Sequence, residues 1–333
     1  MTFQWTLGAA RGAVLAAAAA FSLGSVAQAQ VKWDLPSVFP DGNFHVTNAK
    51  RFAEEVKKTG VDITIHPGGS LGFKGPDMLK TIRDGLVPIG DITFIYLGGE
   101  APIFDLEAQP YLISTLDELQ ILWKHFRPVV DKIAEQWNQK ILYVAPWPRQ
   151  YVYTKTPMAK LEDLRGMKIR TYNKTTTDMF NRVGMSAVML PWGEVVPALA
   201  AGTISSVTTS TSSGVDGKFW EFMKHMYPIS HVWSHNATVV NLDAWKKLKP
   251  EQRAEIEAIG KRLQPEFLKV AIAEDETKAK MLVDKGVQLG PADPAIIQQM
   301  RELTKPMVLE FLNKHPVAME VAQKFLAEVG RKL

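Results

Sequence analysis

Two arginines, Arg149 and Arg170, stand where strands of the predicted sheet end, and this placement suits them to bind an anion. Open α/β sheets bind ligands beyond the carboxyl ends of their strands. A guanidinium offers N–H donors in a rigid fork that matches the two oxygens of a carboxylate. The two residues therefore predict an organic acid ligand. The alternative for each arginine is an ordinary salt bridge to a neighbouring acidic side chain.

Aromatic and hydroxyl-bearing side chains lie close to these arginines in the sequence. Trp147, Trp192 and Trp233 each adjoin a junction between a loop and a strand, where a tryptophan either packs in the core or forms the wall of a ligand site. Residues 208–214 are rich in serine and threonine and predict a loop, suited either to turn formation or to hydrogen bonds with a ligand.

The motifs of common enzymes and metal sites do not occur in the sequence. His231 and His235 have the spacing of metal ligands on a helix, but their surroundings favour a turn and a strand, and no HExxH pattern follows. Residues 68–72 lack the spacing and the lysine of phosphate-binding loops and predict a turn before a helix. A catalytic role would need a base near Arg170, and Glu194 and the two histidines form no recognisable set. We therefore expect no catalysis, no metal ion and no cofactor.

The elements that must position these residues alternate between strand and helix patterns, which predicts an α/β fold. In the middle of the chain, strands are expected at 167–170, 186–190 and 203–209, with a helix capped by Asn173 or Thr175 and a second helix at 194–201. Strands joined in this way run parallel, so their carboxyl ends share one edge of the sheet. This arrangement would bring Arg170, Trp192 and Thr209 to the same rim.

The remaining elements follow the same alternation. Further helices are expected at 47–58, 76–85, 116–138 with Pro128 as a candidate break, and 250–286 with interruptions at Gly260 and Pro265. Further strands are expected at 61–67, 88–97, in two pieces within 141–155, and at 237–241.

The ends and the composition limit the classes of protein. Arg11 is the one charged residue of 1–30, an apolar run follows it, and Ala27 and Ala29 form a cleavage pattern, so residues 1–29 are expected to be an export signal cut after about Ala29. We therefore expect a periplasmic protein. The formal net charge of +4 over 333 residues is too small to indicate a nucleic-acid partner, and the absence of cysteine excludes thiol catalysis and cysteine-ligated metals.

Several segments together resemble the DctP-type solute-binding proteins of TRAP transporters, which are tripartite ATP-independent periplasmic transporters. These segments are 66–72, 78–93, 148–173, 185–207 and 241–253, and the most specific is the pattern P-x-x-x-L-x-D-L-x-G-x-K-x-R that ends at Arg170. The resemblance implies a two-lobe, type II-like periplasmic-binding-protein fold, with crossing strands and a long helix linking the lobes. The first lobe would comprise 30–147 plus about 236–272, and the second 148–235 plus about 273–333.

The resemblance also implies how such a protein would work. Arg170 would pair with the substrate carboxylate, Arg149 and Trp192 match other site positions, and the lobes would close on the ligand like a hinge. A TRAP membrane permease, driven by an ion gradient, would be the partner of the monomeric loaded protein. A sensor-coupled binding protein with the same cleft is an alternative.

The ligand depends on positions where this chain departs from the family pattern. Thr209 stands where an asparagine is usual, and this exchange, with the tryptophans, favours a monocarboxylate with an aromatic or short apolar body, such as a 2-oxo or 2-hydroxy acid. A sugar acid or a dicarboxylate is the alternative. The residues expected to bind the substrate are Phe39, Gly69, Thr93, Phe94, Arg149, Arg170, Asn173, Trp192, Thr208, Thr209, Ser212, Trp233 and Asn236.

Overall fold

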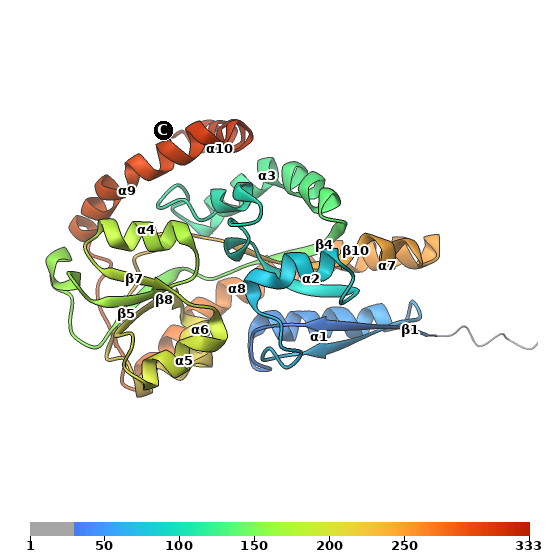
Figure 1. The fold of residues 1–333 in the computed structure, drawn as a ribbon, viewed down its shortest axis with the longest axis horizontal. Helices are drawn as coiled ribbons and strands as arrows, with labels where there is room; N and C mark the ends of the chain where they lie inside the picture. Colours follow the sequence, from blue (N-terminus) through green and yellow to red (C-terminus); the bar gives the residue numbers. More distant parts are fainter. Residues whose placement is uncertain (1–29) are drawn as a thin grey trace, which may run out of the picture.

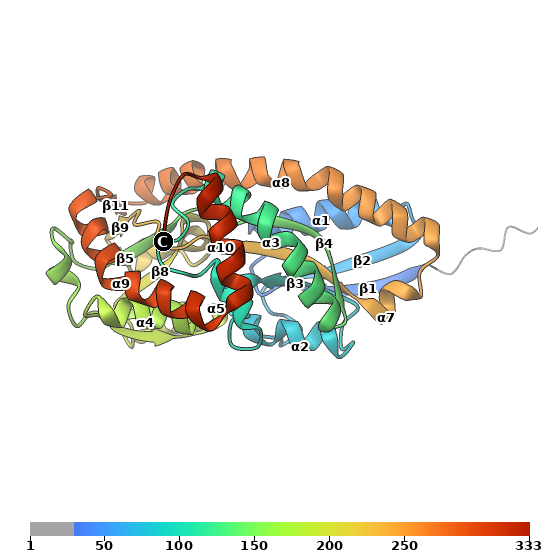
Figure 2. The same cartoon turned by 90° about the horizontal axis from the view of Figure 1, so that it is seen from above.

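The computed structural model describes residues 30–333, and the predicted export signal at 1–29 lies outside the described residues. The chain forms two α/β lobes side by side, with one long helix running along both (Figures 1 and 2). The predicted two-lobe architecture is confirmed. Within residues 30–333 no helix is both long enough and apolar enough to cross a bilayer.

The first lobe contains two small sheets. Strand β1 (Val31–Pro36) pairs in parallel with β2 (Val61–His66), and β10 (His235–Asn241) lies between β3 (Ile89–Thr93) and β4 (Gln139–Pro146), antiparallel to both. The helices of this lobe are α1 (Phe44–Lys57), α2 (Met78–Arg83), α3 (Leu116–Gln136) and α7 (Leu242–Lys246), with short 3-10 turns η1 (Gly75–Asp77), η2 (Phe94–Tyr96) and η3 (Pro102–Leu106).

The second lobe is built on one six-stranded sheet. Its strands lie in the order β11 (Gln288–Leu289), β9 (His225–Tyr227), β5 (Gln150–Thr154), β8 (Ser206–Ser210), β6 (Lys168–Thr171) and β7 (Ser186–Met189). Strand β6 is parallel to both β7 and β8, as predicted. The connecting elements are η4 (Leu161–Leu164), α4 (Lys174–Arg182), α5 (Trp192–Ala200), α6 (Thr211–Asp216) and η5 (Phe219–Glu221).

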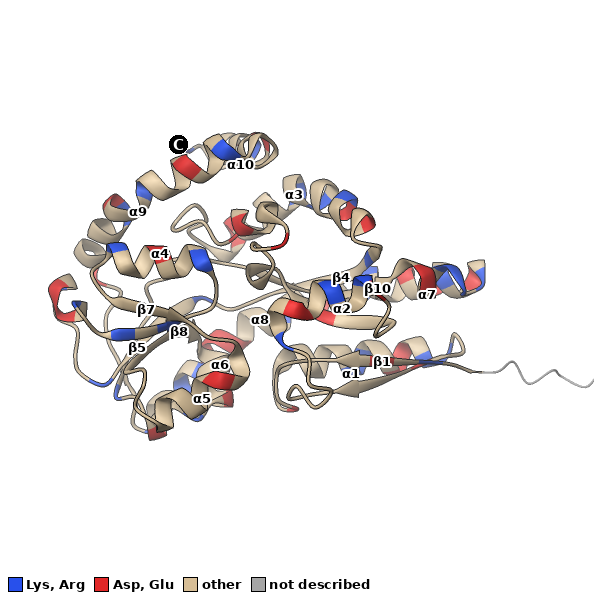
Figure 3. Ribbon diagram, in the orientation of Figure 1, with Lys and Arg blue, Asp and Glu red and all other residues tan. Residues whose placement is uncertain are grey.

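The lobes are joined by segments that cross between them. The chain passes from β4 to β5 through 147–149 and returns from β9 to β10 through 228–234, while α8 (Pro250–Asp284) runs along both lobes (Figure 2). Helix α9 (Pro294–Lys314) follows, and α10 (Pro316–Glu328) then packs against α3 in the core of the first lobe. Acidic and basic positions alternate along these outer helices (Figure 3).

Two helices pass unbroken through residues that were candidate interruptions. Pro128 lies inside α3, where its exposed ring faces solvent between the buried side chains of Phe126 and Val130. Gly260 lies inside α8 because the helix passes close to β4: a Cβ at this glycine would stand 2.5 Å from the carbonyl oxygen of Leu142. In both helices the buried face outweighs the low helix propensity of one residue.

Two local predictions were wrong. The strand expected at 88–97 ends at Thr93, and the chain turns into η2, whose Phe94 packs in the core. The loop expected at 208–214 is instead the end of β8 followed by α6. Ser210 caps this short helix by accepting a hydrogen bond from the amide of Ser213 at 3.2 Å. Serine and threonine favour caps as well as turns, and packing of α6 against α8 decides for the helix.

Candidate functional site

A cavity lies between the lobes, where both crossing segments pass. The space between its atoms amounts to about 410 Å³, a volume that includes open solvent at its mouth. Side chains from the first lobe, the second lobe and the crossing segments line it: Phe39, Thr93, Ile95, Tyr96, Trp147, Gln150, Arg170, Tyr172, Trp192, Thr209, Ser210, Ser213, Val232, Trp233 and Ser234.

Arg170 is the one cation in the lining of this cavity and is 1% exposed. Its Nε and Nη2 donate to the carbonyl oxygen of Leu190 at 3.0 and 2.9 Å, and Nη1 donates to that of Thr208 at 3.5 Å. These bonds come from the ends of β7 and β8 and fix the plane of the guanidinium. They use three N–H groups of the five that a guanidinium carries, and the side chain of Tyr96 is a further hydrogen-bond partner, so part of the donor fork remains for another acceptor.

No acidic side chain of residues 30–333 forms an ion pair with Arg170. Burial lowers the pKa of its guanidinium, while Tyr96 and then Tyr172 act in the opposite direction. The carbon Cζ lies 5.7 Å from the ring centre of Tyr172 and 6.0 Å from that of Trp192. Aromatic faces offset part of the cost of burying a cation, but a buried charge is ordinarily paired. The site therefore has a positive charge without its anion.

Two further donors in the cavity have no partner within the described residues. Trp147 and Trp233 both line the cavity, both are buried, and neither indole Nε1 is hydrogen-bonded. An indole N–H can only donate, and a buried donor left unpaired costs about 1–3 kcal/mol. The cavity is thus lined by a guanidinium and by two tryptophans whose indole donors are unpaired within the described residues, a set that suits a ligand rich in acceptor oxygens.

Aromatic and hydroxyl groups form the rest of the wall. The ring of Trp147 packs edge-on against Phe39 at 4.8 Å between centroids and also contacts Phe44 and His45. Burial lowers the pKa of His45 well below its usual value, with His235 acting in the same direction, so the histidine behind this wall is neutral. On the opposite side, Thr209, Ser210 and Ser213 supply hydroxyls from β8 and α6.

Six of the expected binding residues line the cavity: Phe39, Thr93, Arg170, Trp192, Thr209 and Trp233. Asn236 lies directly behind Thr93, whose hydroxyl donates to its Oδ1 at 2.6 Å. Thr208 lies behind Arg170 and bonds the ring of His231 at 3.1 Å. These two polar residues support the wall from behind.

Five other expected residues lie away from the cavity lining. Arg149 pairs with Asp275 of α8, its Nε lying 2.5 Å from the carboxylate, which is the salt-bridge alternative. Ser212 donates to Glu274 at 2.9 Å, and Phe94 packs in the core of the first lobe. Gly69 occupies the turn after β2 with a positive φ of 69°. Asn173 caps α4 by accepting from the amide of Thr176.

Sequence reasoning missed the two tyrosines that flank Arg170. Tyr172 lies two residues beyond Arg170, and its hydroxyl is 3.1 Å from Nε2 of His231. Tyr96 ends η2, which was expected to be strand. The proximity of Tyr172 to Arg170 in the sequence could have indicated the first, whereas the approach of Tyr96 depends on how the lobes pack.

Hydrogen bonds between side chains join the two lobes. Asn43, which caps α1, donates to Asp216 of α6 at 2.6 Å. Asp105 of η3 accepts from Asn173 and from Thr175 of α4, each at 3.2 Å. Burial raises the pKa of both aspartates to about 6, and their hydrogen bonds act in the opposite direction. Each contact pairs a carboxylate of one lobe with a helix cap of the other.

The two histidines that were considered as metal ligands serve other roles. Burial lowers the pKa of His231 to about 3, so it is neutral behind Tyr172 and Thr208. His235 Nδ1 lies 2.7 Å from Glu107, and both side chains are buried. Among residues 30–333 no group of three or more His, Asp or Glu side chains is placed to hold a metal ion.

The chain is similar to known solute-binding proteins. Residues 36–315 match the family model DctP, described as bacterial extracellular solute-binding protein, family 7. A solute-binding protein of Albidiferax ferrireducens is 22% identical over 274 residues, 80% of each chain. The 2,3-diketo-L-gulonate-binding periplasmic protein YiaO of Escherichia coli is 25% identical over 252 residues, 71% of this chain and 73% of that protein.

Solved structures share the fold. DctP7 of Bordetella pertussis, an extracytoplasmic solute receptor binding pyroglutamic acid, superimposes with a TM-score of 0.85 at 27% identity, over 89% of this chain and 99% of that chain. A TRAP solute-binding protein from a marine metagenome, specific for pyroglutamate, gives a TM-score of 0.84 at 26% identity, over 89% and 98%.

Proposed function

The chain belongs to the DctP family of bacterial extracellular solute-binding proteins, and from this premise we propose that it captures a small organic acid by pairing the acid's carboxylate with Arg170. It is a binding protein and not an enzyme, as the family assignment requires. The observation that carries the proposal is a buried guanidinium, fixed by two backbone carbonyls and without a carboxylate partner in the described chain.

A carboxylate would complete this site. Charge-assisted hydrogen bonds from a guanidinium to a carboxylate are short and about twice as strong as neutral ones. They would use N–H capacity of Arg170 that the backbone carbonyls leave, and the indole N–H groups of Trp147 and Trp233, unpaired within the described residues, would suit further oxygens of the ligand. Because the lining comes from both lobes, such a ligand stabilises the arrangement in which the lobes meet.

The cavity favours a small monocarboxylate with a short apolar or ring-shaped body. Six aromatic side chains contribute to its walls. Arg170 is the one cation among the described residues of the lining, whereas a dicarboxylate would need a second cation to pair with its second charge. Pyroglutamic acid, which DctP7 of Bordetella pertussis binds, is the first candidate, followed by 2-oxo and 2-hydroxy acids of similar size. The loaded protein, acting as a monomer in the periplasm, would deliver the acid to a TRAP membrane permease.

A thermal-shift screen of small organic acids, followed by calorimetry, tests the proposal. Ligands that bind only the folded state raise the melting temperature by mass action. We expect at least one monocarboxylate to shift the wild-type protein, Arg170→Ala to lose that shift, and Arg149→Ala to keep it. If the Arg170→Ala protein binds the same acid within about threefold of wild type, a factor worth less than 1 kcal/mol, the proposal is wrong.

A further inference from the structure

A buried chain of hydrogen bonds ends at the cavity wall in the first lobe. Asp91 accepts from the hydroxyl of Ser37 at 2.7 Å and from Nδ2 of Asn236, and Oδ1 of Asn236 accepts from the hydroxyl of Thr93 at 2.6 Å. All four side chains are buried. Thr93 lines the cavity, whereas the other three lie behind it.

The chemistry of Asp91 fixes the direction of every bond in this chain. Burial raises the pKa of Asp91 to about 6, against the effect of the bonds from Ser37 and Asn236, so the carboxylate is ionised at neutral pH. An ionised carboxylate can only accept. Asn236 must therefore turn its amide nitrogen to Asp91 and its amide oxygen to Thr93, independently of how the amide would otherwise be assigned.

The same logic fixes the hydroxyl of Thr93. The amide oxygen of Asn236 can only accept, so Thr93 must donate its one proton to it. What remains on the threonine oxygen is its acceptor capacity. A threonine hydroxyl can ordinarily donate or accept. Here Asp91, acting through Asn236, leaves the hydroxyl of Thr93 able only to accept from a ligand.

Three other residues of the lining contribute groups of the opposite kind, N–H donors. Arg170, Trp147 and Trp233 all have N–H groups without partners. A complementary ligand therefore carries a carboxylate and further acceptor oxygens for these donors, and one donor for Thr93. If the ligand instead placed an acceptor oxygen next to Thr93, the lone pairs of that oxygen and of the threonine hydroxyl would repel each other.

We propose that Thr93, oriented by Asn236 and Asp91, selects acids that carry an N–H or O–H donor over acids of the same shape that lack it. The inference rests on the proposed capture of an organic acid and deepens it by naming a chemical subclass. Among small ring-shaped acids, a lactam acid has the required set: a carboxylate, a ring carbonyl oxygen and a ring N–H. A site built to bond such a group rejects the analogue without it.

The test compares matched pairs of acids by calorimetry at neutral pH. The central pair is pyroglutamate and γ-butyrolactone-γ-carboxylate, which differ in having a ring N–H or a ring oxygen. Lactate with propionate, and mandelate with phenylacetate, extend the comparison to O–H donors. We expect the wild-type protein to bind the donor-bearing member of a pair roughly 10- to 100-fold more tightly, the effect of gaining one buried hydrogen bond and avoiding one repulsion.

Variants of Thr93 separate this role from a structural one. Thr93→Val keeps the shape and removes the oxygen, so the ratio of affinities within a pair should fall to within about threefold, below the worth of one hydrogen bond. Thr93→Ser should keep the wild-type ratio. Because each ratio compares two ligands on one protein, a general loss of stability cancels.

The outcomes distinguish the two proposals. Equal affinities within the pairs for the wild-type protein, or a preference that persists in Thr93→Val, would overturn the selection by Thr93 while leaving acid capture by Arg170 in place. If the wild-type protein binds none of these acids and no other acid in the screen, both proposals fall together.

Discussion

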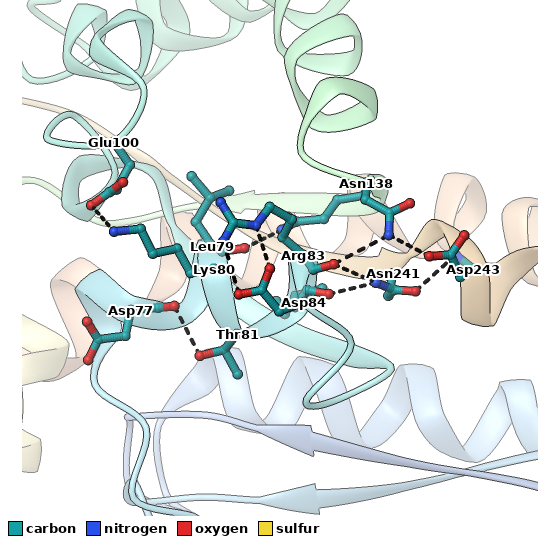
Figure 4. Close-up of polar contacts among 12 residues, drawn as sticks. Asp77, Leu79, Lys80, Thr81, Arg83, Asp84, Glu100, Asn138, Asn241 and Asp243 are labelled. Carbon is teal, nitrogen blue, oxygen red and sulfur yellow. Dashed lines mark hydrogen bonds and ion pairs between the residues drawn. The ribbon is translucent and has the colours of Figure 1, made fainter.

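Asn138 and Asn241, at the far end of the first lobe, find hydrogen-bond partners within the chain, whereas several donors at the cavity between the lobes have none within the described residues. At the far end, Asn241 donates to the carbonyls of Ile82 and Arg83 and caps α7 by accepting from the amide of Asp243 (Figure 4). Asn138 joins the same cluster through a bond of 2.8 Å to Asp243. Each group here has a partner from a different element of the same lobe.

The cavity differs because several of its hydrogen-bond donors are unpaired within the described residues. Within residues 30–333, Arg170 has backbone partners but no carboxylate partner, and the indole donors of Trp147 and Trp233 have no hydrogen-bond partner. Buried polar groups are nearly always satisfied in folded proteins, so a cluster of unpaired donors marks a place where something outside the chain binds. We infer that the hydrogen bonds of the first region stabilise the fold and that the unpaired donors of the second region serve to bind a ligand.

The two arginines show the same contrast on a smaller scale. Arg149 follows β4 and Arg170 lies near the end of β6, but within the described residues only Arg149 pairs with a carboxylate, that of Asp275. Tyr151 and Thr211 also donate to Asp275, each at 3.2 Å, so Arg149 belongs to a satisfied cluster that ties α8 to the second lobe. From the sequence alone, both arginines were equally good candidates to bind the carboxylate of a ligand.

The largest expected effect comes from removing the charge of the cavity. Arg170→Met keeps an apolar stem in place of the guanidinium, and we expect acid binding to weaken by at least about 100-fold, the worth of two charge-assisted hydrogen bonds. The free energy of unfolding of the ligand-free protein should stay the same or rise, because a buried charge without a counter-ion is costly. Calorimetry and urea unfolding measure the two effects, and a marked loss of stability would make Arg170 a structural residue instead.

The second prediction concerns Asn241 at the far end of the first lobe, where we expect a substitution to lower stability and leave acid binding unchanged. Asn241→Ala removes the cap of α7 and the donor to two buried carbonyls, and should lower the free energy of unfolding by about 2 kcal/mol. The melting temperature should fall by roughly 5 °C. Affinity for the acid should not change. A variant that unfolds normally but binds weakly would show that the two regions are coupled.

The third prediction concerns the indole donors. Trp233→Phe removes one N–H from the cavity and should weaken acid binding roughly fivefold, the worth of about 1 kcal/mol. Trp245→Phe, in the core of the first lobe, is the matched control and should lower stability without altering affinity. Equal affinities for wild type and Trp233→Phe would mean that this N–H does not face the ligand.

The smallest expected effect lies in the contacts between the lobes. The pKa of Asp216 is raised from 3.8 to about 6, so the folded protein binds its proton more tightly than the unfolded chain does between these values. Its contribution to stability is therefore largest in acid and is lost as the pH rises through 6. Asp216→Asn should be more stable than wild type at pH 7 by roughly 1–3 kcal/mol. The difference should shrink as the pH falls through 6 and vanish below the unfolded pKa of 3.8.

Urea unfolding at several pH values checks this prediction. Asp105→Asn should behave in the same way, since burial raises the pKa of Asp105 to about 6 as well. Asp117→Asn, at an exposed position in the first turn of α3, is the control and should show no such difference. If the advantage of Asp216→Asn grows in acid, the sign of the linkage is wrong.

Much of the scaffold could be predicted because local patterns carry it. The parallel strands β6, β7 and β8 were expected from apolar runs separated by helix patterns, and the cap of α4 was expected at Asn173 or Thr175, of which the structure uses Asn173. The segment 208–214 was mistaken for a loop because serine and threonine suit both turns and caps, and only its packing against α8 selects the helix. Local propensity leaves such a choice open.

The sequence alone determined that strands would deliver Arg170 to the edge of a sheet, since strand order, chirality and alternation depend on neighbours along the chain. Only the tertiary structure decided which arginine stays without a carboxylate, and that Thr93 has its proton committed to Asn236. Those outcomes depend on residues more than a hundred positions apart, such as Arg149 with Asp275. Burial and pairing are properties of the packed chain, and they turn two similar arginines into a structural tie and a candidate binding group.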